Sequence, residues 1–225
     1  MAEHTAEART EGQKQTSMTC QSVREFTGKL AGKDPVPGGG GAAAVAAALG
    51  AALGSMTANL AVGKKRYADH QEELTKLTQQ LSELIDQLLS CVDKDAENFL
   101  PLLEAYKLPH GTSEETQKKD AAIEAATQMA NEVPLSIIRL CLQALNLIGE
   151  AEEKGSRMAI SDAAAGARLA GAAIDAAALN VYINTRSMKD REKAQEQQRQ
   201  ADEMTSLGAE LSDAIYRKVL NEIRG

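Results

Sequence analysis

A carboxylate occupies a position that helix periodicity assigns to the core. Leucines and one cysteine recur in steps of three and four along residues 74–91, which is one stripe of an amphipathic helix. The next position on this stripe is Asp95, and the stripe resumes at Phe99 and Leu102, whereas Asp93 lies on another face. A charge among apolar neighbours is costly unless it is paired, hydrogen-bonded or protonated, and such settings tune carboxylates for acid–base chemistry. Asp95 is therefore the candidate catalytic residue, and the structural alternative is a carboxylate that caps or bridges a neighbouring helix.

A second candidate is the proline- and glycine-rich stretch at residues 35–41, which precedes an alanine-rich helix expected over residues 42–62. The N-terminus of a helix presents unpaired N–H groups and the positive end of the helix dipole, which suit an anion or an oxyanion. A tight turn that lets two helices approach explains the same composition. The candidate binding residues of this loop are Pro37, Gly38, Gly39 and Gly40.

The helix expected over residues 42–62 is long enough to cross a membrane. We reject that interpretation because most of its apolar residues are alanine, a weak hydrophobe, and polar side chains such as Thr57 interrupt it. The spacing of Gly50 and Gly54 indicates close contact between helices. We expect a central helix, buried on most sides and placed near a subunit interface.

Basic and amide residues supply the remaining candidates. Lys64, Lys65 and Arg66 follow a glycine where the helix should end, so they either complement the helix dipole or form a cationic patch for an anionic ligand. Asn180 and Asn184 are four residues apart on one face of a helix expected over residues 162–186. They either face solvent or hydrogen-bond to a ligand or another helix.

The composition predicts an all-α fold. Hydrophobic residues make up 43% of the 225-residue chain but aromatic residues only 3%, and the core must therefore be built from Ala, Leu, Ile, Val and Met. Alanine-rich, aromatic-poor chains favour closely packed helices over a sheet. We expect a bundle of about five to seven helices with Ala/Gly-rich central helices, forming a single domain over residues 17–225. Residues 1–16 are polar, lack periodicity and are expected to form a flexible leader.

Charge and cysteine usage exclude several classes of function. The net charge of −7 argues against a nucleic-acid-binding protein, which needs a basic face. Three widely spaced cysteines do not form a disulfide framework, which indicates a reducing, cytoplasmic location. Three histidines stand far apart without the spacing of metal ligands, so we expect no metal site.

Several short motifs of this sequence occur together, in this order, in one known family. They are Pro37–Gly40, Gly63–Tyr67, Val92–Phe99, Ser161–Ala163 and Asn180–Asn184. Over roughly residues 20–220 the chain resembles the formiminotetrahydrofolate cyclodeaminase and methenyltetrahydrofolate cyclohydrolase family. The resemblance implies an all-helical, usually dimeric protein that acts on folate without a metal or redox cofactor.

The resemblance also implies roles for individual residues. Asp95 matches the carboxylate that the family regards as catalytic. The glycine stretch, the basic stretch at residues 64–66, Asp162 and the asparagine pair would line the folate site, with the basic side chains on the glutamate tail. Two positions depart from the family pattern, since many members have Ser where this chain has Gly41, and Asn is common where Ser156 falls.

We expect a methenyltetrahydrofolate cyclohydrolase, which hydrolyses 5,10-methenyltetrahydrofolate to 10-formyltetrahydrofolate. The preference over the cyclodeaminase reaction rests on the apparent lack of a fused formiminotransferase domain in this sequence. The alternatives are a formiminotetrahydrofolate cyclodeaminase, which releases ammonia from 5-formiminotetrahydrofolate, and a non-catalytic helical folate-binding or scaffold protein. The latter would retain the small-residue helix faces without needing Asp95.

Overall fold

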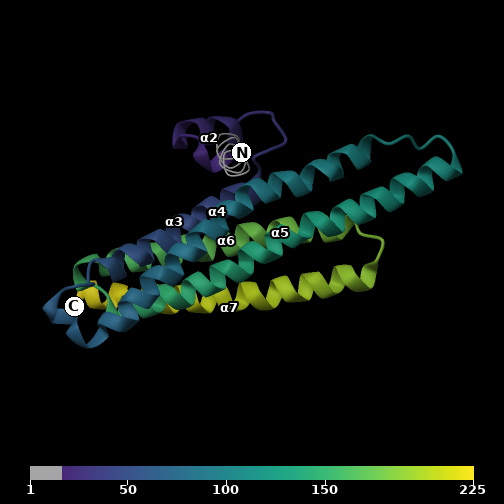
Figure 1. Cartoon of the computed structure of the whole chain (residues 1–225). Helices are drawn as coiled ribbons and strands as arrows, with labels where there is room; N and C mark the ends of the chain where they lie inside the picture. The colour runs from purple at the N-terminus through teal and green to yellow at the C-terminus, as the bar shows by residue number, and fades with distance from the viewer. Residues whose placement is uncertain (1–16) are drawn as a thin grey trace, which may run out of the picture.

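The computed structural model describes residues 17–225, which form helices and short connections without a strand (Figure 1). The α-helices are α2 (Val23–Leu30), α3 (Gly39–Asn59), α4 (Gln71–Lys107), α5 (Ser113–Lys154), α6 (Ile160–Ser187) and α7 (Arg191–Arg224). Short 3-10 helices cover Met18–Cys20, Lys65–His70 and Arg157–Ala159. The expected all-α class is confirmed, and the expected leader at residues 1–16 lies outside the described part.

Four of the helices, α3 to α6, form a bundle in which each contacts its neighbours, and α3 also contacts α5 across the centre. The long helix α7 packs on α5 and α6 from outside. Figure 1 shows α2 on the outside of the bundle, where its Phe26 packs against the core, and the connected ends of α4 and α5 projecting beyond the other helices. The bundle therefore has an end at which α4 and α5 extend past the N-terminus of α3.

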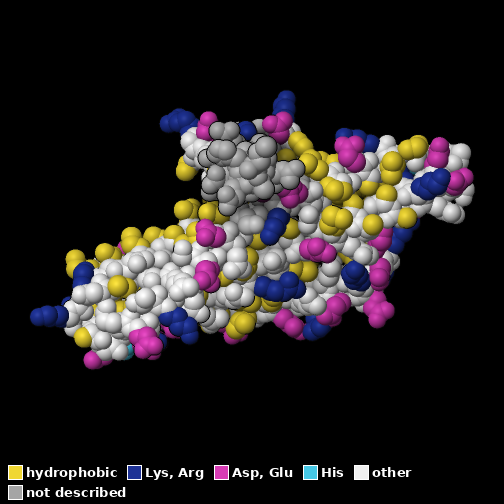
Figure 2. Space-filling view, viewed as in Figure 1, with side chains coloured by type: hydrophobic (Ala, Val, Ile, Leu, Met, Phe, Trp, Pro, Cys, Tyr) yellow, Lys and Arg dark blue, Asp and Glu magenta, His cyan; other side chains and the backbone are white. Residues whose placement is uncertain are grey.

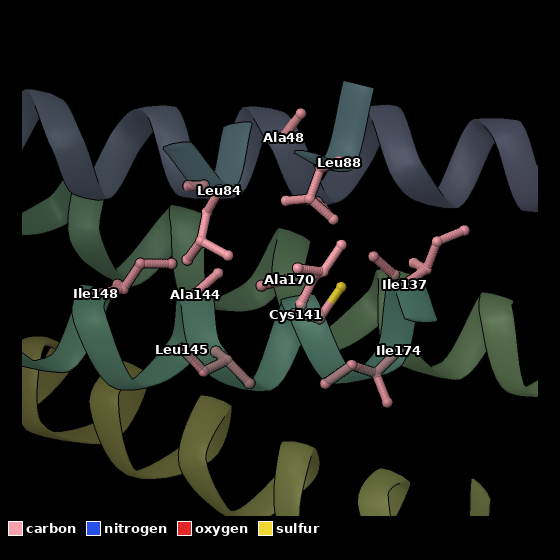
Figure 3. Close-up of a cluster of buried hydrophobic side chains, with 14 of the residues drawn as sticks. Ala48, Leu84, Leu88, Ile137, Cys141, Ala144, Leu145, Ile148, Ala170 and Ile174 are labelled. Atoms are coloured by element: carbon pink, nitrogen blue, oxygen red, sulfur yellow. The ribbon is translucent and has the colours of Figure 1, made fainter. Parts of the chain in front are cut away.

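The core joins the leucine stripe of α4 to small and branched residues from four other helices, α3, α5, α6 and α7, and Figure 3 shows part of it. The predicted stripe is confirmed, since each of its leucines and the cysteine at its end are buried. Those residues are Leu74, Leu77, Leu81, Leu84, Leu88 and Cys91. Opposite Leu84 and Leu88, α3 offers mainly alanine, which lets the helix axes lie close together.

The two small-residue helices, α3 and α6, meet at a pair of glycines. A Cβ atom on Gly50 would lie 2.7 Å from the carbonyl oxygen of Gly166, and a Cβ on Gly166 would lie 2.6 Å from that of Gly50. Either substitution would force the helices apart, because such separations lie well inside van der Waals contact. Farther along, Thr57 Oγ1 donates to the carbonyl of Ala159 at 3.0 Å. The expected close helix contact at Gly50 is thus confirmed.

Two expected helix starts are wrong. Helix α3 begins at Gly39, with Gly38 as its N-cap, so the glycines expected to form a loop make up the first helical turn. Helix α6 begins at Ile160 with Ala159 as N-cap, and Ser161 therefore lies inside the helix. The chain enters α6 directly from the 3-10 helix Arg157–Ala159, and no side chain caps the start of α6.

Capping residues explain the starts of two other helices. Ser22 caps α2 in a capping box with Glu25, and Ser17 caps the preceding 3-10 helix. Thr112 and Glu115 form a capping box at the start of α5. Both α4 and α5 continue through an internal proline, so neither proline ends its helix.

Two of the described helices, α3 and α5, are long and apolar enough to cross a membrane by length and composition alone. Both pack against at least three neighbouring helices, and 56% of each apolar window is buried inside the protein. Core helices of a bundle have this environment.

Candidate active site

A cavity of about 690 Å³ opens where the N-terminus of α3 meets the middle of α4 and the C-terminus of α6. Its volume falls in the range of small-molecule sites. The lining residues are Pro35, Val36, Gly38, Gly39, Gly40, Asp95, Phe99, Leu102, Tyr106, Ala130, Pro134, Asn180, Ile183, Asn184, Arg186 and Ser187. The cavity therefore brings together the glycine stretch, Asp95 and both asparagines that the sequence singled out.

Asp95 lies directly against the first turn of α3. Its Oδ2 atom accepts a hydrogen bond of 3.0 Å from the backbone N–H of Gly41. A Cβ atom on Gly40 would lie 2.6 Å from the Asp95 carboxyl carbon and 2.7 Å from Oδ2, so only glycine leaves room for the carboxylate. The glycines thus let an acidic side chain from α4 approach the positive end of the α3 dipole.

The environment of Asp95 acts on its ionisation in two directions. Removal of the carboxylate from water raises its pKa, and the hydrogen bond from the Gly41 N–H lowers it to a smaller extent. The net effect raises the pKa of Asp95 above the ordinary value of an aspartate. A half-buried carboxylate of this kind can accept a proton and return it within one reaction cycle.

Asp93 has a different, structural role. Its carboxylate accepts a hydrogen bond of 2.6 Å from Ser17 Oγ and one of 2.8 Å from the Met18 backbone N–H. These bonds attach the segment before α2 to α4. The two aspartates therefore face different surroundings, as the helix periodicity predicted.

The asparagine pair lines the cavity wall formed by α6. Asn180 Nδ2 donates to the Ala176 carbonyl at 3.0 Å, and this side chain adjoins Gly39, where a Cβ would lie 3.7 Å from Nδ2. Asn184 lies one turn farther along α6 and also lines the cavity. Both side chains are half-buried, so the reading of simple solvent exposure is not supported.

The remaining candidates lie elsewhere in the chain. Lys64, Lys65 and Arg66 are exposed beyond the far end of α3, which at 21 residues is about 30 Å long. Asp162 is in the first turn of α6, near that same end, whereas the asparagines are near its C-terminus. Pro37 is buried behind the first turn of α3. In the described part of the chain, this basic stretch therefore lies away from the cavity.

The sequence reasoning missed several lining residues. Phe99 and Leu102 belong to the Asp95 stripe, so their position could have been predicted from the same periodicity. Tyr106 continues the same stripe four residues after Leu102, whereas Arg186 gave no such signal, because basic residues are common in the last turn of a helix. Within residues 17–225, no three His, Cys, Asp or Glu side chains gather closely enough to hold a metal ion.

Comparison with known proteins decides which family carries this arrangement. A profile of the formiminotransferase-cyclodeaminase family matches residues 22–203, which include α2 to α6 and the first third of α7. The chain belongs to this family. The matched range contains the whole cavity, from the proline preceding α3 to the C-terminal end of α6.

Relatives within the formiminotransferase-cyclodeaminase family carry two names. The methenyltetrahydrofolate cyclohydrolase of Methylorubrum extorquens is 36% identical over 203 residues, covering 90% of this chain and 98% of that protein. The formimidoyltransferase-cyclodeaminase of Mus musculus is 32% identical over 174 residues, covering 77% of this chain. The chain spans about a third of the length of the latter protein, since 32% of it is covered.

A solved structure in this family has a similar fold. The crystal structure of formiminotetrahydrofolate cyclodeaminase from Thermotoga maritima superposes with a TM-score of 0.75 at 25% sequence identity. The match covers 89% of this chain and 98% of that chain. The Thermotoga maritima protein and the present chain therefore share the same helical architecture over most of their lengths.

Proposed function

We propose that this protein is a methenyltetrahydrofolate cyclohydrolase, which converts 5,10-methenyltetrahydrofolate and water to 10-formyltetrahydrofolate. The observation that carries the proposal is the Asp95 carboxylate, half-buried in an apolar cavity and hydrogen-bonded to the first turn of α3. The 36% identity to a cyclohydrolase over most of both chains supports this reaction over others.

The substrate places a cationic amidinium carbon between two folate nitrogens. An ionised Asp95 offsets that positive charge and accepts a proton from the water that attacks the carbon. The tetrahedral intermediate then breaks one of its two carbon–nitrogen bonds. Asp95 returns its proton to the departing nitrogen, while the hydroxyl proton of the intermediate is released to solvent as the formyl group forms. These steps use acid–base chemistry alone, and the proposal includes no metal or redox cofactor.

The alternative function is a formiminotetrahydrofolate cyclodeaminase. The structural neighbour from Thermotoga maritima and the Mus musculus relative, whose names include this activity, favour it. In that reaction one folate nitrogen attacks the formimino carbon and ammonia leaves. Both reactions pass through a tetrahedral carbon between the same two nitrogens, so one carboxylate serves either path.

Incubation of the purified protein with each substrate tests the proposal. Loss of methenyl absorbance on addition of 5,10-methenyltetrahydrofolate, faster than the uncatalysed reaction, supports the cyclohydrolase. Gain of that absorbance together with ammonia from 5-formiminotetrahydrofolate supports the cyclodeaminase. A protein that binds folate but accelerates neither reaction would be the non-catalytic helical protein.

The proposal includes a homodimer formed through the outer face of α3 and α6. Large apolar side chains point outward there, including Leu49 and Met56 on α3, Leu60 directly after it, and Leu179 and Ile183 on α6. Figure 2 shows hydrophobic side chains along the edge of the bundle where α3 lies. A second copy would remove this face, which we call the α3/α6 face, from water.

We also propose a cytoplasmic location without membrane or nucleic-acid partners. The cysteines at positions 20, 91 and 141 are all free, which is consistent with a reducing compartment. The net negative charge of the chain disfavours a nucleic-acid partner.

A further inference from the structure

The cavity carries two charged side chains among the residues that line it, and they have opposite signs. Asp95 lies against the first turn of α3, and Arg186 belongs to the last turn of α6. The other lining residues are apolar, amide, hydroxyl or glycine. The cavity therefore presents one negative and one positive position to a bound molecule.

Arg186 lies between the cavity and a neighbouring surface groove. It lines the cavity that holds Asp95, and it also lines a shallow neighbouring groove together with Gly39, Leu179 and Tyr182. Its side chain is exposed, which places it at the mouth of the cavity and not at its closed end. A ligand that extends out of the cavity through its mouth would pass this arginine.

The cations that follow Arg186 in sequence are held by other groups. Lys189 pairs with Asp120, and the Arg191 guanidinium donates to the backbone carbonyls of Thr185 and Met188. Among the described residues no carboxylate forms an ion pair with Arg186. Its guanidinium therefore keeps its donors available for a ligand, with the planar geometry that binds carboxylates in a bidentate manner.

We propose that Arg186 binds a carboxylate of the glutamate tail of the substrate and thereby fixes its orientation in the cavity. This inference rests on the proposed function. A methenylfolate carries a cation at its reacting carbon and anions at the opposite end. Asp95 and Arg186 offer the complementary charges, so the reacting carbon lies at Asp95 while the tail leaves through the mouth.

The basic stretch at residues 64–66 is the competing source of a tail contact. Within one chain it lies beyond the far end of α3, about 30 Å along that helix from Gly39. A basic stretch of this kind could reach the cavity only from a partner subunit. Arg186 needs no such assembly, because it lines the cavity of its own chain.

Arg186→Gln, Arg186→Lys and Lys65→Gln should be compared with Arg139→Gln, which removes an exposed arginine of α5 outside the cavity. The substrates are methenylfolates with no glutamate, with one and with several, each at two salt concentrations. Melting temperature and light scattering show whether each variant keeps its fold and its oligomeric state.

We expect Arg186→Gln to raise KM about tenfold or more for glutamate-bearing substrate, with kcat nearly unchanged. Arg186→Lys should recover part of the loss, higher salt should shrink the effect, and the substrate without glutamate should show none. Arg139→Gln should behave as wild type.

Unchanged KM in Arg186→Gln would overturn the assignment, as would an equal rise for the substrate that lacks glutamate. A rise in Lys65→Gln alone would also overturn it and assign the tail to the partner's basic stretch. If the wild-type protein converted neither 5,10-methenyltetrahydrofolate nor 5-formiminotetrahydrofolate, the proposed function would be wrong. The assignment of Arg186 would then be wrong as well.

Discussion

The Asp95 carboxylate fills the space that a side chain at Gly40 would occupy. A Cβ at that position would lie 2.6 Å from the carboxyl carbon, and the neighbouring Gly41 N–H holds Oδ2 at 3.0 Å. The absence of a side chain on α3 thus determines where the acid of α4 can sit. The glycines contribute to the candidate site through this close approach and their N–H groups, and not through a flexible loop.

Gly40→Ala should therefore displace Asp95 and lower kcat at least about a hundredfold. This factor is the lower end of the rate enhancement that acid–base catalysis usually contributes. Alanine is about 1 kcal/mol more favourable than glycine inside a helix, so the melting temperature should fall little despite the clash. Steady-state kinetics and thermal unfolding check both parts. Gly28→Ala is the matched control, because a Cβ there meets nothing within 4 Å. Full activity in Gly40→Ala would show that the carboxylate position is not critical.

Removal of the Asp95 charge itself gives a second prediction. Asp95→Asn keeps the size of the side chain but abolishes proton transfer, so we expect a loss of about a hundred- to ten-thousand-fold in kcat. Asp93→Asn should retain most activity and instead lower the melting temperature, because Ser17 and Met18 donate to that carboxylate. Retention of more than about a tenth of the wild-type rate by Asp95→Asn would exclude acid–base catalysis of the usual size.

The raised pKa of Asp95 predicts how activity depends on pH. If the ionised carboxylate accepts the proton from water, kcat/KM falls on the acid side as Asp95 becomes protonated. The midpoint should lie above the ordinary aspartate value of about 3.9, because burial raises the pKa of this carboxyl group. A pH–rate profile measures it directly. If the midpoint of the acid side of the profile lay at or below the ordinary pKa of an aspartate, the argument from burial would be wrong.

The same shift predicts a change in stability of defined sign. Because the pKa of Asp95 is higher in the folded than in the unfolded chain, its favourable contribution is fully present below the unfolded pKa. That contribution is lost as the pH rises through the folded pKa, so the ionised group is destabilising at neutral pH. Asp95→Asn should thus melt at the same or a higher temperature than wild type at pH 7. The difference should disappear in acid, and a lower melting temperature at pH 7 would contradict this.

The sequence was sufficient to predict Asp95 because its signal is periodic. Six buried residues on one stripe of α4 define the inward face, and a carboxylate on that face is recognisable without coordinates. The start of α3 was not predictable in this way. Glycine is a poor helix former, so the four successive glycines at residues 38–41 indicate a loop unless a group that needs their space is known.

The positions of the cationic residues could not be predicted for a different reason. The basic stretch at residues 64–66 belongs to a motif that resembles the family. The sequence of a motif, however, does not show how far its residues lie in space from those of another motif. The 21-residue helix α3 carries that stretch to the opposite end of the bundle. Arg186 looks like an ordinary basic residue at a helix C-terminus, and only the packing of α6 beside α3 places it at the cavity.

The last prediction concerns assembly through the α3/α6 face. Leu49 is 56% exposed near the middle of α3, among alanines and other apolar side chains. A charge placed there would be buried without a partner if a second copy covers the face, so Leu49→Glu should convert a dimer to monomers. Leu207→Glu is the control, because Leu207 is 46% exposed on α7, away from this face.

Light scattering at micromolar concentration separates the outcomes. We expect dimers for wild type and Leu207→Glu, and monomers with a retained helical circular dichroism spectrum for Leu49→Glu. Helix α3 also carries the glycines that hold Asp95, so loss of the dimer should lower activity if the partner steadies this helix. A wild-type protein that is monomeric and fully active would refute the dimer, and a dimeric Leu49→Glu would place the interface on another face.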